Sequence, residues 1–193
     1  MPDSKGEHKL IIITAPSGSG KSTIVRYLLQ EMPDLSFSVS ACTRSPRPGE
    51  THGVSYYFIS VADFQQKISN GEFAEYEMVY EGKYYGTLNS ELSRIWNNQQ
   101  FPLVDIDVQG ALRLKQYFEQ KALTIFIQAP SMDELEKRLR GRGTETEASL
   151  QERLNKAREE LLYADRFDTR IINDNLAMAC ENVARSIRQF LAD

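Results

Sequence analysis

The feature that most restricts the fold of this chain is a glycine-rich segment between an apolar run and an amphipathic stretch. It reads Ala15-Pro16-Ser17-Gly18-Ser19-Gly20-Lys21-Ser22. The apolar run Lys9–Thr14 before it is typical of a buried strand. The helix that opens at Lys21 ends before Pro33 and has one apolar face, formed by Ile24, Val25, Leu28 and Leu29. This order of elements predicts a loop that binds polyphosphate at a helix N-terminus.

Each residue type in the loop fits that chemistry. Glycines let backbone N–H groups turn toward phosphate oxygens, Lys21 would reach the β- and γ-phosphates, and the Ser22 hydroxyl would ligate Mg²⁺. Ala15 stands where the usual pattern has glycine, a small change unless that position needs a positive φ. The alternative is an ordinary glycine turn with a chance lysine. The expected ATP-binding residues are Ala15, Pro16, Ser17, Gly18, Ser19, Gly20, Lys21, Ser22 and Thr23.

Composition narrows the class of protein. The 193 residues suffice for one α/β domain, and the net charge of −4 argues against non-specific binding to nucleic acid or an anionic membrane. No apolar stretch approaches the length of a membrane span. Two cysteines and a polar start without a secretory signal fit a cytoplasmic protein, with residues 1–8 as a disordered tail.

Strand-like and helix-like segments alternate along most of the chain, which predicts a mainly parallel sheet covered on both faces. The strand-rich middle, roughly Ser38–Tyr85, breaks this alternation and is interpreted as an insertion. Asp105 lies at the end of the apolar strand Phe101–Val104. It could hold a water molecule on Mg²⁺ or act only as a cap or turn residue.

Four further segments resemble the guanylate kinase family. They are residues 38–50 (SVSACTRSPRPGE), Tyr84-Tyr85-Gly86-Thr87, Asp105-Ile106-Asp107-Val108-Gln109-Gly110 and Arg138-Leu139-Arg140-Gly141-Arg142-Gly143. The resemblance implies a three-layer α/β P-loop kinase fold over residues 9–191. The expected parts are a core (9–37, 87–137 and 161–191), a mixed-strand GMP-binding insertion (38–86) and a helical lid (138–160). It also implies a kinase that uses Mg²⁺ to transfer the γ-phosphoryl group of ATP to GMP, and dGMP as well.

The resemblance assigns the acceptor phosphate to Arg44, Arg47, Tyr56 and Tyr85. Arginine suits this task because its planar fork bonds phosphate oxygens in pairs. GMP already carries a nucleophilic anionic oxygen, so no general base is needed, and the positioned cations must offset repulsion between two polyanions. Without the resemblance, a solvated basic loop and packed strand tyrosines would explain these residues equally well.

The base contacts are assigned by resemblance to Glu75, Asp107, Ser40 and Thr87. Guanine presents N1–H and its 2-amino group as adjacent donors and O6 as an acceptor, which suits a carboxylate and a hydroxyl. Adenine would place a lone pair opposite the carboxylate, so such a site can reject AMP. Read alone, Glu75 is an exposed strand carboxylate.

Arginines of the lid, Arg138, Arg142 and Arg153, are expected to supply positive charge to the transferring group, whereas Arg140 is expected in surface salt bridges. Asn173 is expected beside the adenine, although an Asn/Asp turn has the same pattern. Two alternatives stay open: a non-catalytic guanylate-kinase-like module that binds peptides, and a P-loop kinase with another small acceptor. The sequence is compatible with a monomer or a homodimer.

Overall fold

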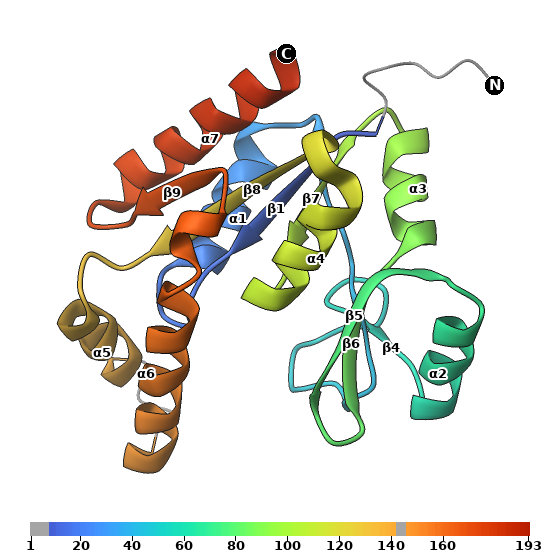
Figure 1. Cartoon of the computed structure of the whole chain (residues 1–193), viewed down its shortest axis with the longest axis horizontal. Coiled ribbons are helices and arrows are strands. Elements are labelled where there is room, and N and C mark those ends of the chain that lie inside the picture. The colour runs from blue at the N-terminus through green and yellow to red at the C-terminus, as the bar shows by residue number, and fades with distance from the viewer. Residues whose placement is uncertain (1–7, 142–145) are drawn as a thin grey trace.

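The computed structural model describes residues 8–141 and 146–193. Its core is a five-stranded sheet in the order β2-β7-β1-β8-β9, and every pairing in it is parallel (Figure 1). The strands are β1 (Leu10–Thr14), β2 (Leu35–Phe37), β7 (Phe101–Asp105), β8 (Ala122–Gln128) and β9 (Thr169–Ile172). The prediction of a mainly parallel core sheet is confirmed.

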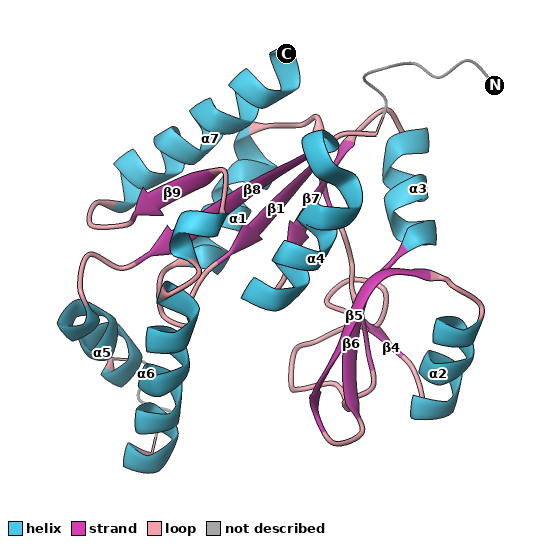
Figure 2. Ribbon diagram, in the orientation of Figure 1, coloured by secondary structure: helices cyan, strands magenta, loops and turns pink. Residues whose placement is uncertain are grey.

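Helices cover both faces of this sheet (Figure 2). On one face lie α1 (Lys21–Glu31) and α7 (Leu176–Ala192), and on the other lie α3 (Asn89–Asn97) and α4 (Val108–Phe118). Successive strand residues point to opposite faces, so in β1 Ile11 and Ile13 pack on the first side and Leu10 and Ile12 on the second. The predicted three-layer arrangement is therefore confirmed.

A second, smaller sheet is built from the middle of the chain, in the order β4-β3-β6-β5. Its strands are β3 (Ala41–Cys42), β4 (Tyr57–Phe58), β5 (Phe73–Tyr80) and β6 (Lys83–Leu88). The β3–β4 pair is parallel and the other two pairs are antiparallel. The chain passes from one sheet to the other between Phe37, which pairs in the core sheet, and Ala41, which pairs in the second one.

Helix α2 (Val61–Ser69) packs against this second sheet and was not anticipated from the sequence. Ser60 caps it by accepting a hydrogen bond from the Asp63 N–H. Phe64 is fully buried and stacks on Phe73 at 4.3 Å and on Tyr84 at 5.2 Å between ring centroids. We call the second sheet together with α2 the small-sheet unit.

Two further helices, α5 (Met132–Arg140) and α6 (Glu147–Leu161), pack on each other and have a small core of their own. That core consists of Ala129, Leu135, Leu139, Leu150, Leu154 and Ala157. We call α5 and α6 the helical pair. Short 3₁₀ turns lie at Glu119–Lys121 and Ala164–Arg166. Arg142 and Gly143 lie outside the described residues, as does the expected tail except for His8, whose ring contacts Trp96.

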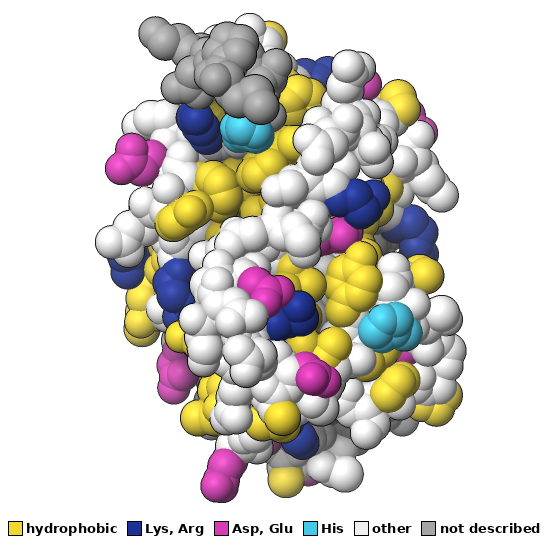
Figure 3. All heavy atoms as spheres, turned by 90° about the vertical axis from the view of Figure 1, so that its right-hand side faces the viewer, with side chains coloured by type: hydrophobic (Ala, Val, Ile, Leu, Met, Phe, Trp, Pro, Cys, Tyr) yellow, Lys and Arg dark blue, Asp and Glu magenta, His cyan; other side chains and the backbone are white. Residues whose placement is uncertain are grey.

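Both cysteines, Cys42 and Cys180, are buried and unpaired. Among the described helices, none has the length and apolar character needed to cross a membrane. On the face drawn in Figure 3, acidic and basic side chains of the described residues are intermixed and form no extended basic patch.

Candidate active site

The glycine-rich loop leaves β1 and enters α1 at the carboxyl edge of the core sheet. Gly20 is the N-cap of α1 and has a φ of 94°, a left-handed conformation that favours glycine. A side chain at this position would also collide with the Asn173 amide. The loop and the N-terminus of α1 line a cleft of about 330 Å³, which we call the loop cleft.

Asn173 holds this loop from behind. Its side chain is only 4% exposed, and its Nδ2 donates a hydrogen bond to the Ser19 carbonyl at 2.8 Å. The family resemblance implied that this residue lies beside the adenine. In the structure its amide nitrogen contacts the loop backbone.

Lys21 forms an ion pair with Asp105 and lies 3.4 Å from the Ile106 carbonyl. Asp105 ends β7, which pairs in parallel with β1, so the two strand ends bring Asp105 beside the loop. The same strand end supplies Asp107, whose Oδ1 accepts hydrogen bonds from the Gln109 and Gly110 N–H groups and caps α4.

Ser22 and Asp105, the two expected magnesium ligands, both lie beside Lys21: Ser22 lines the loop cleft, and Asp105 pairs with the lysine. Mg²⁺ in kinases takes one or two protein ligands directly or through water, and substrate phosphates supply others. Among the residues that the structure describes, no three His, Cys, Asp or Glu side chains form a cluster able to hold a metal by themselves. The donor set therefore fits an ion that arrives with its nucleotide.

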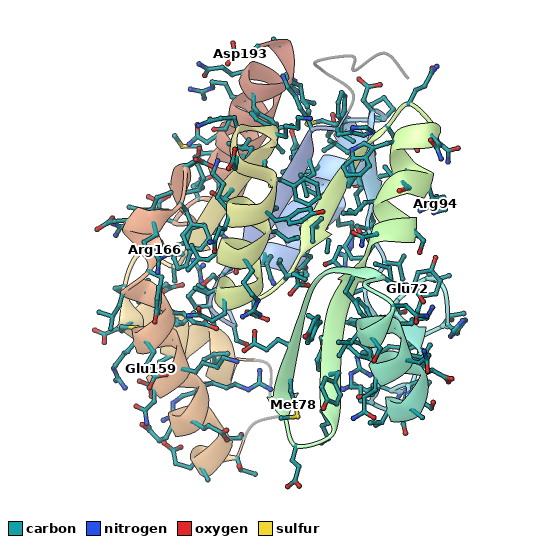
Figure 4. The ribbon with its side chains drawn as sticks, turned by 45° about the vertical axis from the view of Figure 1, so that its right-hand side comes forward. Glu72, Met78, Arg94, Glu159, Arg166 and Asp193 are labelled. Atoms are coloured by element: carbon teal, nitrogen blue, oxygen red, sulfur yellow. The ribbon has the colours of Figure 1, made fainter. Side chains whose placement is uncertain are left out.

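A larger cleft of about 530 Å³ lies between the small-sheet unit, α4 and α6. Figure 4 shows α6, with Glu159, across from the β5–β6 hairpin, which carries Met78 near its tip. Five of the expected acceptor residues line this larger cleft: Ser40, Tyr56, Glu75, Tyr85 and Asp107. Arg44, Arg47 and Thr87 do not line it.

Glu75 is a carboxylate that is only 7% exposed. Its Oε1 accepts a hydrogen bond from the buried Thr87 hydroxyl at 3.0 Å, and Arg113 Nη2 lies 3.8 Å from its Oε2. Burial raises the pKa of Glu75 to about 7, and the nearby Asp107 acts in the same direction. Helix α4 comes close at Gly110, where a Cβ would lie 3.0 Å from Glu75 Oε2.

Arg44 is held tightly by its neighbours at the edge of the larger cleft. Both of its terminal nitrogens donate to Glu50, at 2.5 and 2.6 Å, and its Nε donates to the Tyr85 hydroxyl at 3.1 Å. Its guanidinium also lies over the Tyr56 ring, 4.9 Å from the centroid. The hydrogen bonds from Arg44 lower the pKa of Glu50 to about 2.

Arg47 is exposed, and its backbone N–H donates to Glu50 Oε2 at 2.8 Å. Glu50 thus organises both arginines of this loop, a role that sequence reasoning missed. The available signal was its spacing, three residues after Arg47 and six after Arg44.

The arginines of the helical pair differ in their contacts. Arg138 pairs with Glu134 at 3.0 Å and donates to the Asn173 carbonyl, while Arg153 Nη1 lies 3.1 Å from the Ser17 hydroxyl in the glycine-rich loop. Arg140 pairs with Glu136 and Glu147, as expected of a surface residue. Arg142 lies outside the described residues.

The loop cleft and the larger cleft adjoin. Four residues line both of them: Lys21, Asp107, Lys156 and Glu160. Lys156 and Glu160 share the α6 face that carries Arg153, a helical spacing from which they could have been found. Burial raises the pKa of Glu160 to about 7. A phosphate-binding loop is thereby joined, at Lys21, to a cavity that contains a buried carboxylate.

Comparison with known proteins matches this architecture to one family. Residues 7–190 match the family model described as guanylate kinase. The chain belongs to the guanylate kinase family. The resemblance drawn from the four sequence segments is therefore confirmed.

Relatives in the guanylate kinase family are similar along their whole length. The chain is 47% identical to the guanylate kinase of Bacteroides fragilis over 190 residues, and this alignment covers 98% of this chain and 93% of the relative. It is 47% identical over 192 residues to that of Salinibacter ruber, covering 100% of both chains. Among solved structures, the guanylate kinase from Anaplasma phagocytophilum superposes with a TM-score of 0.77 at 28% identity, over 96% of this chain and 87% of that one.

Proposed function

We propose that this protein transfers the γ-phosphoryl group of ATP to GMP, and also to dGMP, with Mg²⁺ as cofactor, giving ADP and GDP. The observation that carries the proposal is the junction of the two clefts at Lys21, with a phosphate-binding loop on one side and Glu75 on the other. The relatives named guanylate kinase support the same reaction. Two buried, unpaired cysteines support the cytoplasm as its compartment.

Residues 15–23 bind the ATP phosphates in this proposal. The N-terminus of α1 and the Gly20 turn offer backbone N–H groups, and Lys21 exchanges its ion pair with Asp105 for the β- and γ-phosphates. That exchange would leave the Asp105 carboxylate available to hold Mg²⁺ through a water molecule, and the Ser22 hydroxyl would be a direct ligand of the ion. Mg²⁺, when bound, offsets the charge on the phosphate oxygens.

Arg44, Arg47, Tyr56 and Tyr85 bind the phosphate of GMP in the proposed complex. Tyr56 and Tyr85 line the larger cleft, and Arg44 lies against both of their side chains. Glu50 fixes the plane of the Arg44 guanidinium, which lowers the entropy lost when phosphate binds. The attacking oxygen belongs to the GMP phosphate itself and is directed in line at the γ-phosphorus.

Glu75 is proposed to accept hydrogen bonds from guanine N1–H and the 2-amino group. Thr87 fixes the carboxylate by donating to Oε1, Asp107 assists at the amino group, and Ser40 donates to O6. Residues 38–86 form the GMP-binding part of the protein in this proposal. The deoxyribose of dGMP leaves all of these base contacts unchanged.

Residues 138–160 act as a lid in the proposed reaction. Arg138, Arg142 and Arg153 supply positive charge to the transferring group, and Asn173 lies beside the adenine while its side chain supports the loop. The Arg153–Ser17 contact supports this role, because it already brings α6 to the glycine-rich loop. Closure would exclude water and so limit ATP hydrolysis.

The direct test of the reaction is ADP release from ATP and Mg²⁺ with a panel of acceptors. We expect fast turnover with GMP and dGMP and at least about 10³-fold lower kcat/KM with AMP, because adenine would leave Glu75 without its donors. CMP, UMP and water serve as further acceptors. Equal rates with all acceptors, or none with any, would contradict the proposal.

The pH dependence of GMP binding provides a second prediction. Glu75 can accept hydrogen bonds from both guanine donors only in its ionised form. Because its pKa is raised to about 7, the carboxylate becomes protonated below pH 7, and this weakens GMP binding. We expect KM for GMP to rise about tenfold per pH unit between pH 6.5 and 5.5 while KM for ATP changes little. Steady-state kinetics at constant ionic strength would measure both values.

Two variants separate Glu75 from other groups that titrate nearby. In Glu75→Gln the steep rise in KM for GMP should disappear. Only the weaker pH dependence caused by the second ionisation of the GMP phosphate, near pH 6, should remain. Glu160→Gln should retain the rise, although the pKa of Glu160 is also about 7. If the rise in KM disappeared in Glu160→Gln and remained in Glu75→Gln, Glu160 would be the group that titrates and the prediction for Glu75 would be wrong.

A further inference from the structure

Glu91 is a second buried carboxylate, located behind the larger cleft in the first turn of α3. It is 3% exposed and bonded by donors from three segments of the chain. Val39 N–H donates to Oε1 at 3.1 Å, the Tyr57 hydroxyl to Oε2 at 3.0 Å, and Arg94 to both oxygens at 2.8 and 3.0 Å. Burial opposes its ionisation, but these donors outweigh it, and the pKa of Glu91 is lowered.

Two partners of Glu91, Val39 and Tyr57, are each adjacent to a residue that we place in GMP binding, and Glu91 itself lies close to a third along the chain. Val39 precedes Ser40, Tyr57 follows Tyr56, and α3 directly continues β6, which carries Thr87. Ser40 and Tyr56 line the cleft, whereas the backbone N–H of Val39 and the side chain of Tyr57 contact Glu91. For the two tyrosines this follows from the extended chain, in which neighbouring side chains point in opposite directions. The Tyr57 N–H also donates to the Ser40 carbonyl at 2.9 Å, which joins the two segments directly.

We propose that Glu91 is a positioning residue for acceptor recognition: it fixes Ser40, Tyr56 and Thr87 relative to one another from behind the cleft. The inference rests on the proposed function of those three residues. Glu91 itself contacts no substrate, because it does not line the cleft. Arg94, which Figure 4 labels on α3, is half-exposed and covers the carboxylate on its solvent side.

The hydrogen bonds to Glu91 fix the positions of the segments that donate them, in addition to stabilising the fold. Each donor to a buried carboxylate offsets part of the cost of removing its charge from water, so moving any donor away is unfavourable. The segments carrying Val39 and Tyr57 are therefore fixed to the start of α3. Glu91 lies 52 residues from Val39 and 34 from Tyr57, so these are long-range contacts. They add a connection to α3 beyond the β3–β4 and β3–β6 pairings.

The test is steady-state kinetics of Tyr57→Phe, with GMP and ATP varied separately. The variant removes one hydroxyl, while Glu91 keeps its bonds to Val39 and Arg94, so the protein should fold. We expect KM for GMP to rise about fivefold and KM for ATP to stay within about twofold, with kcat nearly unchanged. Glu91→Gln should show the same selective change at about tenfold or more, together with a lower Tm.

Asp168→Asn is a matched control far from the cleft. Asp168 likewise accepts from a backbone N–H, a hydroxyl and a cation: Thr124 N at 2.8 Å, Thr124 Oγ1 at 2.7 Å and Lys115 Nζ at 2.9 Å. Its replacement should lower Tm and leave both KM values unchanged. If Tyr57→Phe and Glu91→Gln only lower Tm, as this control does, Glu91 has a structural role and the proposal is wrong.

The outcome for the wild-type protein separates this inference from the proposed function. Wild-type protein that releases no ADP with GMP would contradict the reaction itself. Equilibrium binding of GMP to the wild type, Tyr57→Phe and Asp168→Asn would then decide the positioning role. Weaker binding confined to Tyr57→Phe supports it, and equal binding by all three overturns it.

Discussion

Replacing Lys21 with alanine is expected to lower kcat for phosphoryl transfer by at least about 10³-fold. Lys21 is the one residue of the glycine-rich loop that lines both clefts, so in the proposed complex its charge would lie where the donor and acceptor phosphates meet. ADP release with GMP at saturating ATP would measure the effect. KM for GMP should change far less, because its phosphate and base contacts are made by other residues.

The fold should survive this substitution, since Lys21 and Asp105 are both partly exposed and water can solvate the carboxylate left behind. Arg26→Ala is the matched control: it removes a cation from the exposed face of the same helix. Its activity should equal that of the wild type. If the Lys21 variant retained more than about a tenth of wild-type kcat, the loop lysine would not be required for phosphoryl transfer and the prediction would be wrong.

Replacing Glu75 with glutamine is expected to lower kcat/KM for GMP by about 10³-fold and to leave KM for ATP nearly unchanged. The glutamine amide offers one acceptor oxygen, and its NH₂ group would oppose a guanine donor. The preference for GMP over AMP should collapse with it. Kinetics with both acceptors would measure this, and a fully retained preference would show that another residue selects the base.

The same substitution should stabilise the protein measured without nucleotides. The pKa of Glu75 is raised to about 7 in the folded protein, so between pH 4.5 and 7 the folded state keeps a proton that the unfolded state releases. Stability is therefore lost as pH rises through this window. Glutamine stays neutral at every pH. We therefore expect the free energy of unfolding of Glu75→Gln to exceed that of the wild type by about 1–3 kcal/mol at pH 8 and to be nearly the same as that of the wild type at pH 5. Urea unfolding at both pH values checks this.

Much of the fold could be predicted from periodicity alone. Strand β1 and helix α1 were expected because an apolar run, a glycine turn and a one-sided apolar helix are local signals. Helix α2 was missed because its burial depends mainly on one residue, Phe64, packing on Phe73 and Tyr84. Periodicity could not show that Phe37 pairs in the core sheet and Ala41 in the second one, since alternation does not reveal which neighbour a strand pairs with.

The candidate site was predictable where a motif carries its own chemistry and not where partners meet across the fold. The glycine-rich loop and the resemblance of the middle segments identified Lys21, Arg44 and Glu75. The burial of Glu91 could not be read from the sequence, because its partners lie far along the chain. Asn173 was expected near a nucleotide base, and its contact with Ser19, 154 residues away, depends on the packing of β9 against the loop.

The way the small-sheet unit joins the core has an evolutionary consequence. The chain enters this unit near Val39 and leaves it at Leu88, and the Val39–Glu91 hydrogen bond shows that entry and exit lie side by side. The unit also has an apolar cluster of its own, formed by Ala41, Phe64 and Leu88. An insert attached at one place with its own core can diverge or be exchanged without disturbing the sheet that carries the phosphate loop. Selection could thus alter the choice of acceptor while the machinery that handles ATP was inherited intact.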